Sequence, residues 1–197
     1  MKMAFWLVLW IGLSAQDESR SRSDSRPTDD PNREQALQAE MEAFKKEATA
    51  IAGQYQIWRG TDRTEKPTLH AQPVLHWTNP VVGASYGSTF VWTANGRPEA
   101  MASIHRWRTK TGGLKEQHEW VSLSLDMLHA ERDDRAVWYP AKAGIELKPI
   151  PGAAAPVDSP VLRMSQMRTL AREFRCLFGP ENNRTEMRLM TQPVYRY

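Results

Sequence analysis

The chain has only one cysteine, Cys176, among its 197 residues. A single cysteine excludes an intramolecular disulfide framework and any metal site built from a cysteine cluster. The sequence also lacks the G-x-G-x-x-G and G-x-x-x-x-G-K-[ST] loops that bind nucleotides, and its five histidines nowhere show the H-E-x-x-H or H-x-H spacing of metal ligands. We therefore predict no cofactor, no metal and no catalytic residue set.

Long apolar runs are scarce as well. The one candidate, the eleven residues Met3–Leu13, is too short to span a bilayer as a mature helix. Lys2 precedes it and small residues follow it, which is the layout of a secretory signal peptide cleaved near residues 14–16. We predict that residues 1–16 are a signal peptide, that the protein is exported to the periplasm or the extracellular space, and that no stable membrane span remains after cleavage. The alternative is an uncleaved N-terminal anchor.

Residues 17–31 contain no large apolar side chain and alternate charges with serine, so they bury too little surface to offset the entropy lost on ordering. We predict a flexible polar leader over 17–31 and a single α+β domain over 32–197. That domain carries 22 basic and 18 acidic side chains. This excess of four positive charges is too small to predict a nucleic-acid partner. The sequence pI of about 9.1 is nevertheless compatible with binding to an anionic envelope surface.

Helical periodicity appears at both ends of the predicted domain. Between residue 32 and Gly53, apolar residues recur every three or four positions and form one stripe: Leu37, Met41, Phe44, Ala48, Ile51 and Tyr55. Ser159-Pro160 predicts the start of a second helix, which ends at Gly179-Pro180. The buried stripe of this second helix comprises Met164, Met167, Ala171, Phe174 and Phe178. We interpret its four arginines as a solvated basic face, and contact with an anionic polymer is the alternative.

The rest of the domain has the pattern of β-strands. The predicted strands are 69–77, broken near Pro73 into an edge strand or two short pieces, 85–93, 98–108, 118–124, 128–132 with 136–139, 145–150 and 185–197. They predict an antiparallel, curved sheet of about five to seven strands with the N-terminal and the C-terminal helix packed on it; the alternative is a barrel-like β fold with flanking helices. Nothing follows the last strand to cover its outer edge, so we expect self-association through this C-terminal edge strand.

The strongest local signal is Asn95-Gly96 between two strand-like runs, which predicts a hairpin with a two-residue type I′ turn. Opposed residues then sum to 191, so that Tyr86 pairs with His105. Because side chains alternate along a strand, the pairing predicts one bulky, aromatic face: Tyr86, Ser88, Phe90, Trp92, Met101, Ser103, His105 and Trp107. The opposite face carries small side chains, which suit a helix lying across it.

Tryptophan is abundant, with eight residues in the chain and six after the predicted signal peptide. All six lie in or beside predicted strands. An indole on a sheet offers a flat apolar surface with a polar N–H, which suits stacking on a sugar ring or a peptide side chain. We predict a binding face formed by Tyr86, Trp92, His105 and Trp107; the alternative is that these rings form a core layer.

Five segments carry a family resemblance: Val74–Gly83, Phe90–Ala100, Val137–Pro140, the helical Arg168–Phe174 and the ending Met187–Tyr197. They resemble a family of uncharacterised exported proteins of planctomycete-type bacteria, over roughly residues 35–197. The resemblance implies export and brings no activity with it, because the family has no assigned function. Relatives continue past the ending seen here, which implies that the sheet of this chain is incomplete at its C-terminal end.

Two functions of different classes are consistent with these features. We predict a non-catalytic binding or structural module of the cell envelope, which binds an envelope or extracellular polymer through the aromatic sheet face. The alternative is an exported, hydrolase-like enzyme whose site gathers His105 with Tyr86 and a carboxylate, or with His118 and Glu119. A deep pocket around such a set would favour the enzyme, and a shallow groove with exposed tryptophans would favour binding.

Overall fold

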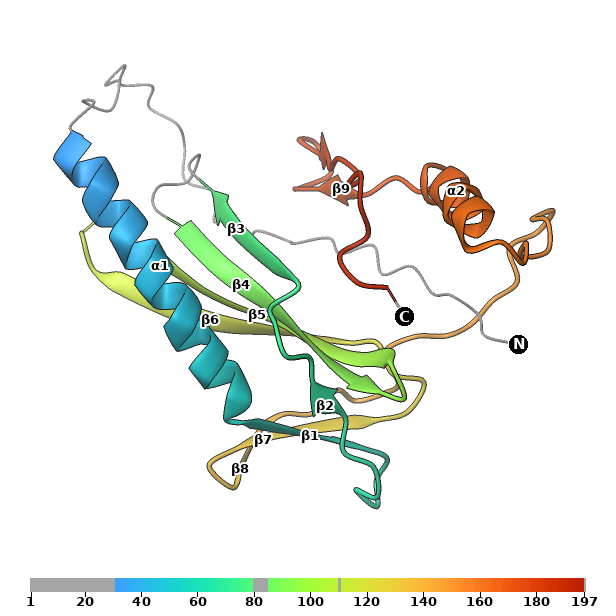
Figure 1. The fold of residues 1–197 in the computed structure, drawn as a ribbon, viewed down its shortest axis with the longest axis horizontal. Coiled ribbons are helices and arrows are strands. Elements are labelled where there is room, and N and C mark those ends of the chain that lie inside the picture. The colour runs from blue at the N-terminus through green and yellow to red at the C-terminus, as the bar shows by residue number, and fades with distance from the viewer. Residues whose placement is uncertain (1–30, 80–84, 110, 197) are drawn as a thin grey trace. The chain divides into compact units, whose positions relative to one another are not determined.

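The computed structural model describes residues 31–79, 85–109 and 111–196. The predicted signal peptide and residues 17–30 of the predicted leader lie outside the described residues. The fold belongs to the α+β class, as predicted, and its antiparallel sheets are open rather than closed into a barrel (Figure 1). Contacts divide the described residues into two units, 31–148 and 149–196, and a single domain over 32–197 stays a prediction.

The larger sheet of the 31–148 unit has five antiparallel strands, in the order β2-β4-β5-β6, with β3 also paired to β4. Their bounds are β2 (Thr68–Leu69), β3 (Leu75–Asn79), β4 (Ser85–Ala94), β5 (Arg97–Arg108) and β6 (Leu114–Ser122). Strands β2 and β3 lie end to end on the same edge of β4, opposite residues 92–93 and 85–89 respectively. The segment containing Pro73 therefore forms two short pieces, one of the two predicted forms, because proline cannot donate a ladder hydrogen bond.

A second, three-stranded sheet has the order β1-β7-β8, with bounds β1 (Tyr55–Arg59), β7 (Leu128–Arg132) and β8 (Arg135–Trp138). Stacked aromatic rings connect the two sheets. The ring of Trp120 in β6 lies 5.2 Å from that of Trp92 in β4 and 5.5 Å from that of Trp138 in β8, with the Trp120 and Trp138 rings stacked.

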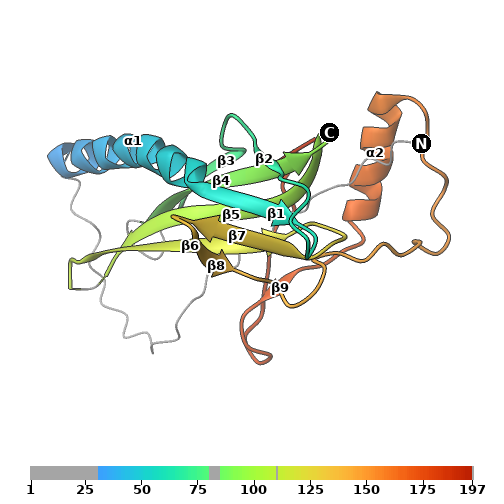
Figure 2. The ribbon, with the colours of Figure 1, turned by 90° about the horizontal axis from the view of Figure 1, so that it is seen from below.

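Helix α1 (Pro31–Gly53) packs along β4 and β5 on one face of the larger sheet, which we call the helix side; the opposite face is the far side (Figures 1 and 2). The predicted apolar stripe accounts for this contact, because Phe44 and Ala48 are almost completely buried. The core cluster also takes in side chains from both sheets: Tyr55, Ile57, Tyr86, Phe90, Trp92, Ala100, Ala102, Ile104, Leu128 and Ala130.

The predicted register of the β4–β5 hairpin is wrong, although the predicted turn is present. Asn95 and Gly96 have φ values of 52° and 82°, as a type I′ turn requires. Next to the turn Thr93 pairs with Pro98, but Trp92 already pairs with Ala100. One extra residue, Glu99, therefore bulges from β5, and from there on Tyr86 pairs with Arg106 rather than with His105.

This β-bulge inverts the faces of β5, because one residue of shift moves every later side chain to the other side of a sheet. Tyr86, Phe90 and Trp92 share the helix side with the small residues of β5, whereas His105 and Trp107 lie on the far side. Tertiary contacts hold the bulge: the carbonyl of Glu99 accepts a hydrogen bond from the backbone N–H of Leu123 at 2.8 Å, and the Glu99 carboxylate accepts one from Arg97, also at 2.8 Å.

The second unit contains α2 (Pro160–Ala171) and a small hairpin of β9 (Leu177–Phe178) and β10 (Thr185–Glu186). The predicted helix is too long: α2 ends at Ala171, and Phe174, predicted in its buried stripe, is 64% exposed. The hairpin explains this end, because pairing of residues 177–178 with 185–186 draws the chain out of a helical path.

Two further predicted strands are wrong. Residues 145–150 form no strand, and the predicted strand over 185–197 is reduced to residues 185–186 among those described. Prolines lie in or next to both segments, at positions 149, 151 and 193, and each lacks the N–H that a ladder needs. The C-terminal edge strand on which the expected self-association depends is thus not formed by residues 187–196. Within the described residues, neither helix is long and apolar enough to cross a membrane.

Candidate functional site

The bulge separates the four residues predicted to form one binding face. Tyr86 and Trp92 are 3% and 1% exposed and belong to the core under α1. His105 and Trp107 lie together on the far side and are partly buried. Tyr86 and Trp92 therefore form part of the core, which was the alternative interpretation of these rings. Of the four predicted residues, only His105 and Trp107 remain candidates for binding.

A third ring joins these two on the far side. Trp77 in β3, Gly87 in β4 and His105 in β5 lie in one line across the sheet. The ring centroids of Trp77 and His105 are 5.4 Å apart, and those of His105 and Trp107 are 5.6 Å apart. We call Trp77, His105 and Trp107 the aromatic row. It places an imidazole between two indoles, which creates a continuous ring surface across three strands.

Gly87 makes the row possible. A Cβ atom at this position would lie 2.7 Å from the Trp77 ring and 2.7 Å from the Cβ of His105, well inside van der Waals contact. With no side chain at the middle position, the two rings meet directly above the backbone of β4. Glycine inside a strand commonly marks such a close approach.

We expect Gly87→Ala to lower the free energy of unfolding by about 1–3 kcal/mol, because the added methyl group must displace Trp77 or His105. Chemical denaturation measures this change. Gly53→Ala is the matched control, since no atom lies within 4 Å of a Cβ at Gly53. A Gly87→Ala protein as stable as the Gly53→Ala protein would contradict the packing described.

Polar groups adjoin the row. The indole N–H of Trp77 donates to the hydroxyl of Ser103 at 3.2 Å, which fixes the ring in place. Burial lowers the pKa of His105, so that the imidazole between the indoles is neutral near pH 7. Burial raises the pKa of Glu119, which lies opposite Ser103 on the same side. The Nδ1 atom of His105 is buried, and the backbone at Ser103 opposes the lowering of the His105 pKa.

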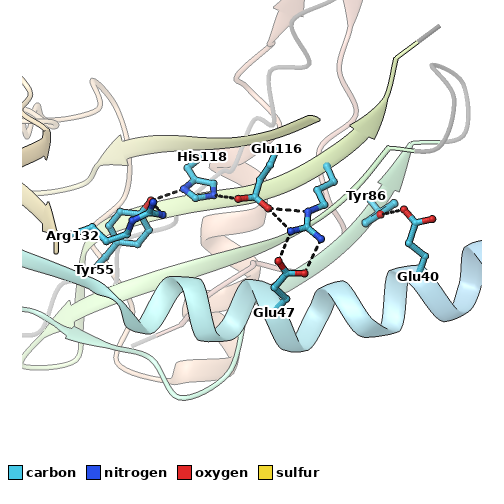
Figure 3. A network of polar contacts seen from close by, with 8 residues as sticks. Glu40, Glu47, Tyr55, Tyr86, Glu116, His118 and Arg132 are labelled. Carbon is cyan, nitrogen blue, oxygen red and sulfur yellow. Dashed lines mark hydrogen bonds and ion pairs between the residues drawn. The ribbon is translucent and has the colours of Figure 1, made fainter. Parts of the chain in front are cut away.

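A different set of polar residues lies on the helix side (Figure 3). We call it the seam network, and its members are Glu47, Arg106, Glu116, His118, Tyr55 and Arg132. Arg106 binds the carboxylates of Glu47 in α1 and Glu116 in β6. His118 contacts Glu116 through Nε2 at 3.0 Å and the Tyr55 hydroxyl through Nδ1. The network thereby joins α1, β5 and β6 to β1.

The seam network resembles a proton relay in its order of groups, but its geometry favours a structural role. If Nε2–H donates to Glu116, then Nδ1 accepts from the Tyr55 hydroxyl. Tyr55 is only 7% exposed, and burial raises its pKa, which disfavours the tyrosinate that a nucleophile or base would need.

Tyr86, outside the seam network, is also held as a neutral phenol. Its hydroxyl donates a hydrogen bond to Glu40 at 2.5 Å, and burial raises its pKa above the usual value.

Neither residue set considered for an enzyme is brought together. Tyr86 lies on the helix side and His105 on the far side. His118 also lies on the helix side, where its carboxylate partner is Glu116, two residues away, rather than the adjacent Glu119. Within the described residues, no group of three His, Cys, Asp or Glu side chains is placed to hold a metal ion.

One hydrolase pattern does occur in the sequence, because Ser85 is the central residue of a G-x-S-x-G motif over residues 83–87. In hydrolases that motif forms a sharp turn from a strand into a helix. Here Ser85 is the first residue of β4, is 7% exposed, and pairs with Trp107. The structural context of a nucleophile is therefore missing.

Sequence reasoning missed Trp77 and the seam network for different reasons. The signal for Trp77 was Gly87, whose position in a run of bulky residues indicates a ring packed above it. The signal for the seam network was the spacing Glu116-x-His118-x-Trp120, which places all three on one face of a strand. Tyr55, the partner of His118, is 63 residues away and leaves no local pattern.

Comparisons of the chain with protein-family models, with curated proteins and with solved structures find no match. The resemblance to exported planctomycete-type proteins thus stays a prediction.

Proposed function

We propose that the protein is an exported, non-catalytic binding module that holds an envelope or extracellular polysaccharide against the aromatic row. The observation that carries this proposal is the row itself, in which Trp77 and Trp107 flank a neutral imidazole on the far side of the sheet. Flat apolar rings stack on the C–H faces of sugars, and the partly buried indoles of Trp77 and Trp107 supply such rings.

The geometry favours binding over catalysis for this row. Among the described residues of the larger sheet, Glu119 is the one carboxylate that the strand register places on the same side near His105. A glycosidase requires two carboxylates on opposite sides of the scissile bond. A hydrolase of the serine type requires an exposed nucleophile beside the histidine, whereas Ser103 already accepts the Trp77 indole N–H.

We expect the full chain to bind at least one of three insoluble probes, namely peptidoglycan, chitin and cellulose, in a pull-down assay. Trp107→Ala should weaken that binding about tenfold or more, which corresponds to at least ~1.4 kcal/mol. Trp58→Ala is the matched control, because Trp58 lies in β1, outside the aromatic row. Thermal melts of both variants separate lost binding from lost folding. Failure to bind any probe, or equal binding by the Trp107→Ala and Trp58→Ala proteins, would contradict the proposal.

A further inference from the structure

The C-terminal part of the chain, residues 149–196, has almost no core. Ala171 is the sole buried residue in this stretch of the described chain; the other residues of α2 are half-buried or exposed, and the β9–β10 hairpin exposes most of its side chains. A unit of this size that folds on its own buries well over half of the surface that its unfolded chain exposes. Residues 149–196 therefore keep a surface that is suited to a partner.

Much of that surface is apolar. Val161 and Leu162, in the first turn of α2, are 78% and 60% exposed, and Phe174 is 64% exposed. Four more large apolar side chains of this stretch are exposed: Ile150, Val157, Leu177 and Met190. A single exposed apolar residue needs no explanation. Seven of them within 48 residues that bury only Ala171 among those described leave apolar side chains that an apolar phase would cover.

The same stretch carries most of the excess positive charge of residues 31–196. Residues 149–196 contain seven arginines, no lysine and four acidic residues, whereas residues 31–148 are nearly balanced, with 15 basic and 14 acidic residues. Arg175 and Arg184 form ion pairs with Glu186 and Glu181. Arg172 and Arg188 are exposed and form no ion pair within the described residues.

We propose that residues 149–196 bind the surface of a membrane containing anionic lipids. Guanidinium groups pair well with headgroup phosphates, and exposed apolar side chains can enter the boundary between headgroups and acyl chains. A second copy of this chain would cover the apolar side chains but would bring the same positive charge, so the arginines favour an anionic partner. This proposal is independent of the aromatic row.

Co-sedimentation of the full chain with vesicles tests it. Vesicles of phosphatidylcholine with 30% phosphatidylglycerol are compared with vesicles of phosphatidylcholine alone. We expect about tenfold tighter binding to the anionic vesicles, and a loss of that preference in high salt as the charges are screened. The predicted apolar signal segment is common to every variant, so it cancels when variants are compared on the same vesicles.

Two double variants separate the contributions. Arg172→Gln with Arg188→Gln should lower the preference for anionic vesicles at least threefold, and Val161→Ser with Leu162→Ser should weaken binding to them at least fivefold. The matched control is Arg135→Gln with Val137→Ser, two exposed residues of β8, which should bind like the parent chain. All four positions in α2 and after it are exposed, so these variants should keep the thermal melt of the parent.

The proposal is overturned if the parent binds both vesicle types equally, or if the C-terminal variants bind like the β8 control. It is also overturned if the chain binds neither vesicle and sedimentation shows a dimer that the Val161→Ser, Leu162→Ser variant dissociates. That last result would assign the surface to a second copy of the chain.

Discussion

Replacement of Glu99 by alanine is expected to lower the free energy of unfolding by about 3 kcal/mol, because it breaks a buried charge pair. The Glu99 side chain is 1% exposed, and its carboxylate lies 2.8 Å from Arg97 and 3.4 Å from Arg59. Alanine would leave both guanidinium groups without this partner and would leave a cavity at the bulge. Because Arg59 and Arg97 are partly exposed, we expect the lower end of the range for buried pairs.

Urea unfolding measures this loss, and Glu65→Ala is the matched control. Glu65 also binds Arg59, but its side chain is 34% exposed, so its removal should cost less than about 1 kcal/mol. Equal losses for the two variants would show that burial of Glu99 does not decide its contribution. Since Glu99 is the bulged residue, the aromatic row should also change in the Glu99→Ala protein, with weaker polysaccharide binding as the readout.

Trp92→Ala should be the most destabilising substitution of a tryptophan, with a loss of about 3–5 kcal/mol. Trp92 is 1% exposed, belongs to the core cluster and contacts the Trp120 ring at 5.2 Å. Its indole lies in the core beside Trp120, whose ring stacks on Trp138 of the second sheet, so the structure around it cannot collapse into the cavity without moving packed rings of both sheets. Urea unfolding of the variant measures the loss.

Trp107→Ala provides the contrast, since Trp107 is partly buried on the far side. We expect it to affect polysaccharide binding strongly and stability by less than half as much as Trp92→Ala. The milder Trp92→Phe should stay folded and should bind polysaccharide like the parent chain. A Trp92→Phe protein that is stable yet no longer binds would place Trp92 in the binding site and contradict the assignment of faces.

The sequence alone was sufficient wherever the signal was local. The apolar stripe around Phe44 and Ala48 predicts a helix with one buried face, and α1 has that face. Asn95-Gly96 predicts a type I′ turn, and its two positive φ values agree. Periodicity and turn chemistry act over a few residues, so they can be read without knowledge of the rest of the chain. The same patterns failed in the C-terminal part, where Phe174 lies outside α2.

Only the tertiary structure decided which side of the sheet each aromatic ring occupies. The bulge at Glu99 depends on Arg59 and on the backbone of Leu123, residues 40 and 24 positions away. A shift of one residue in pairing exchanges the two faces of a strand, so this distant contact placed Tyr86 and Trp92 in the core and His105 and Trp107 on the far side. The candidate site could not be predicted from the sequence for that reason: the rings are visible in the composition, but which of them meet follows from a bulge whose contacts include residues far away in the chain.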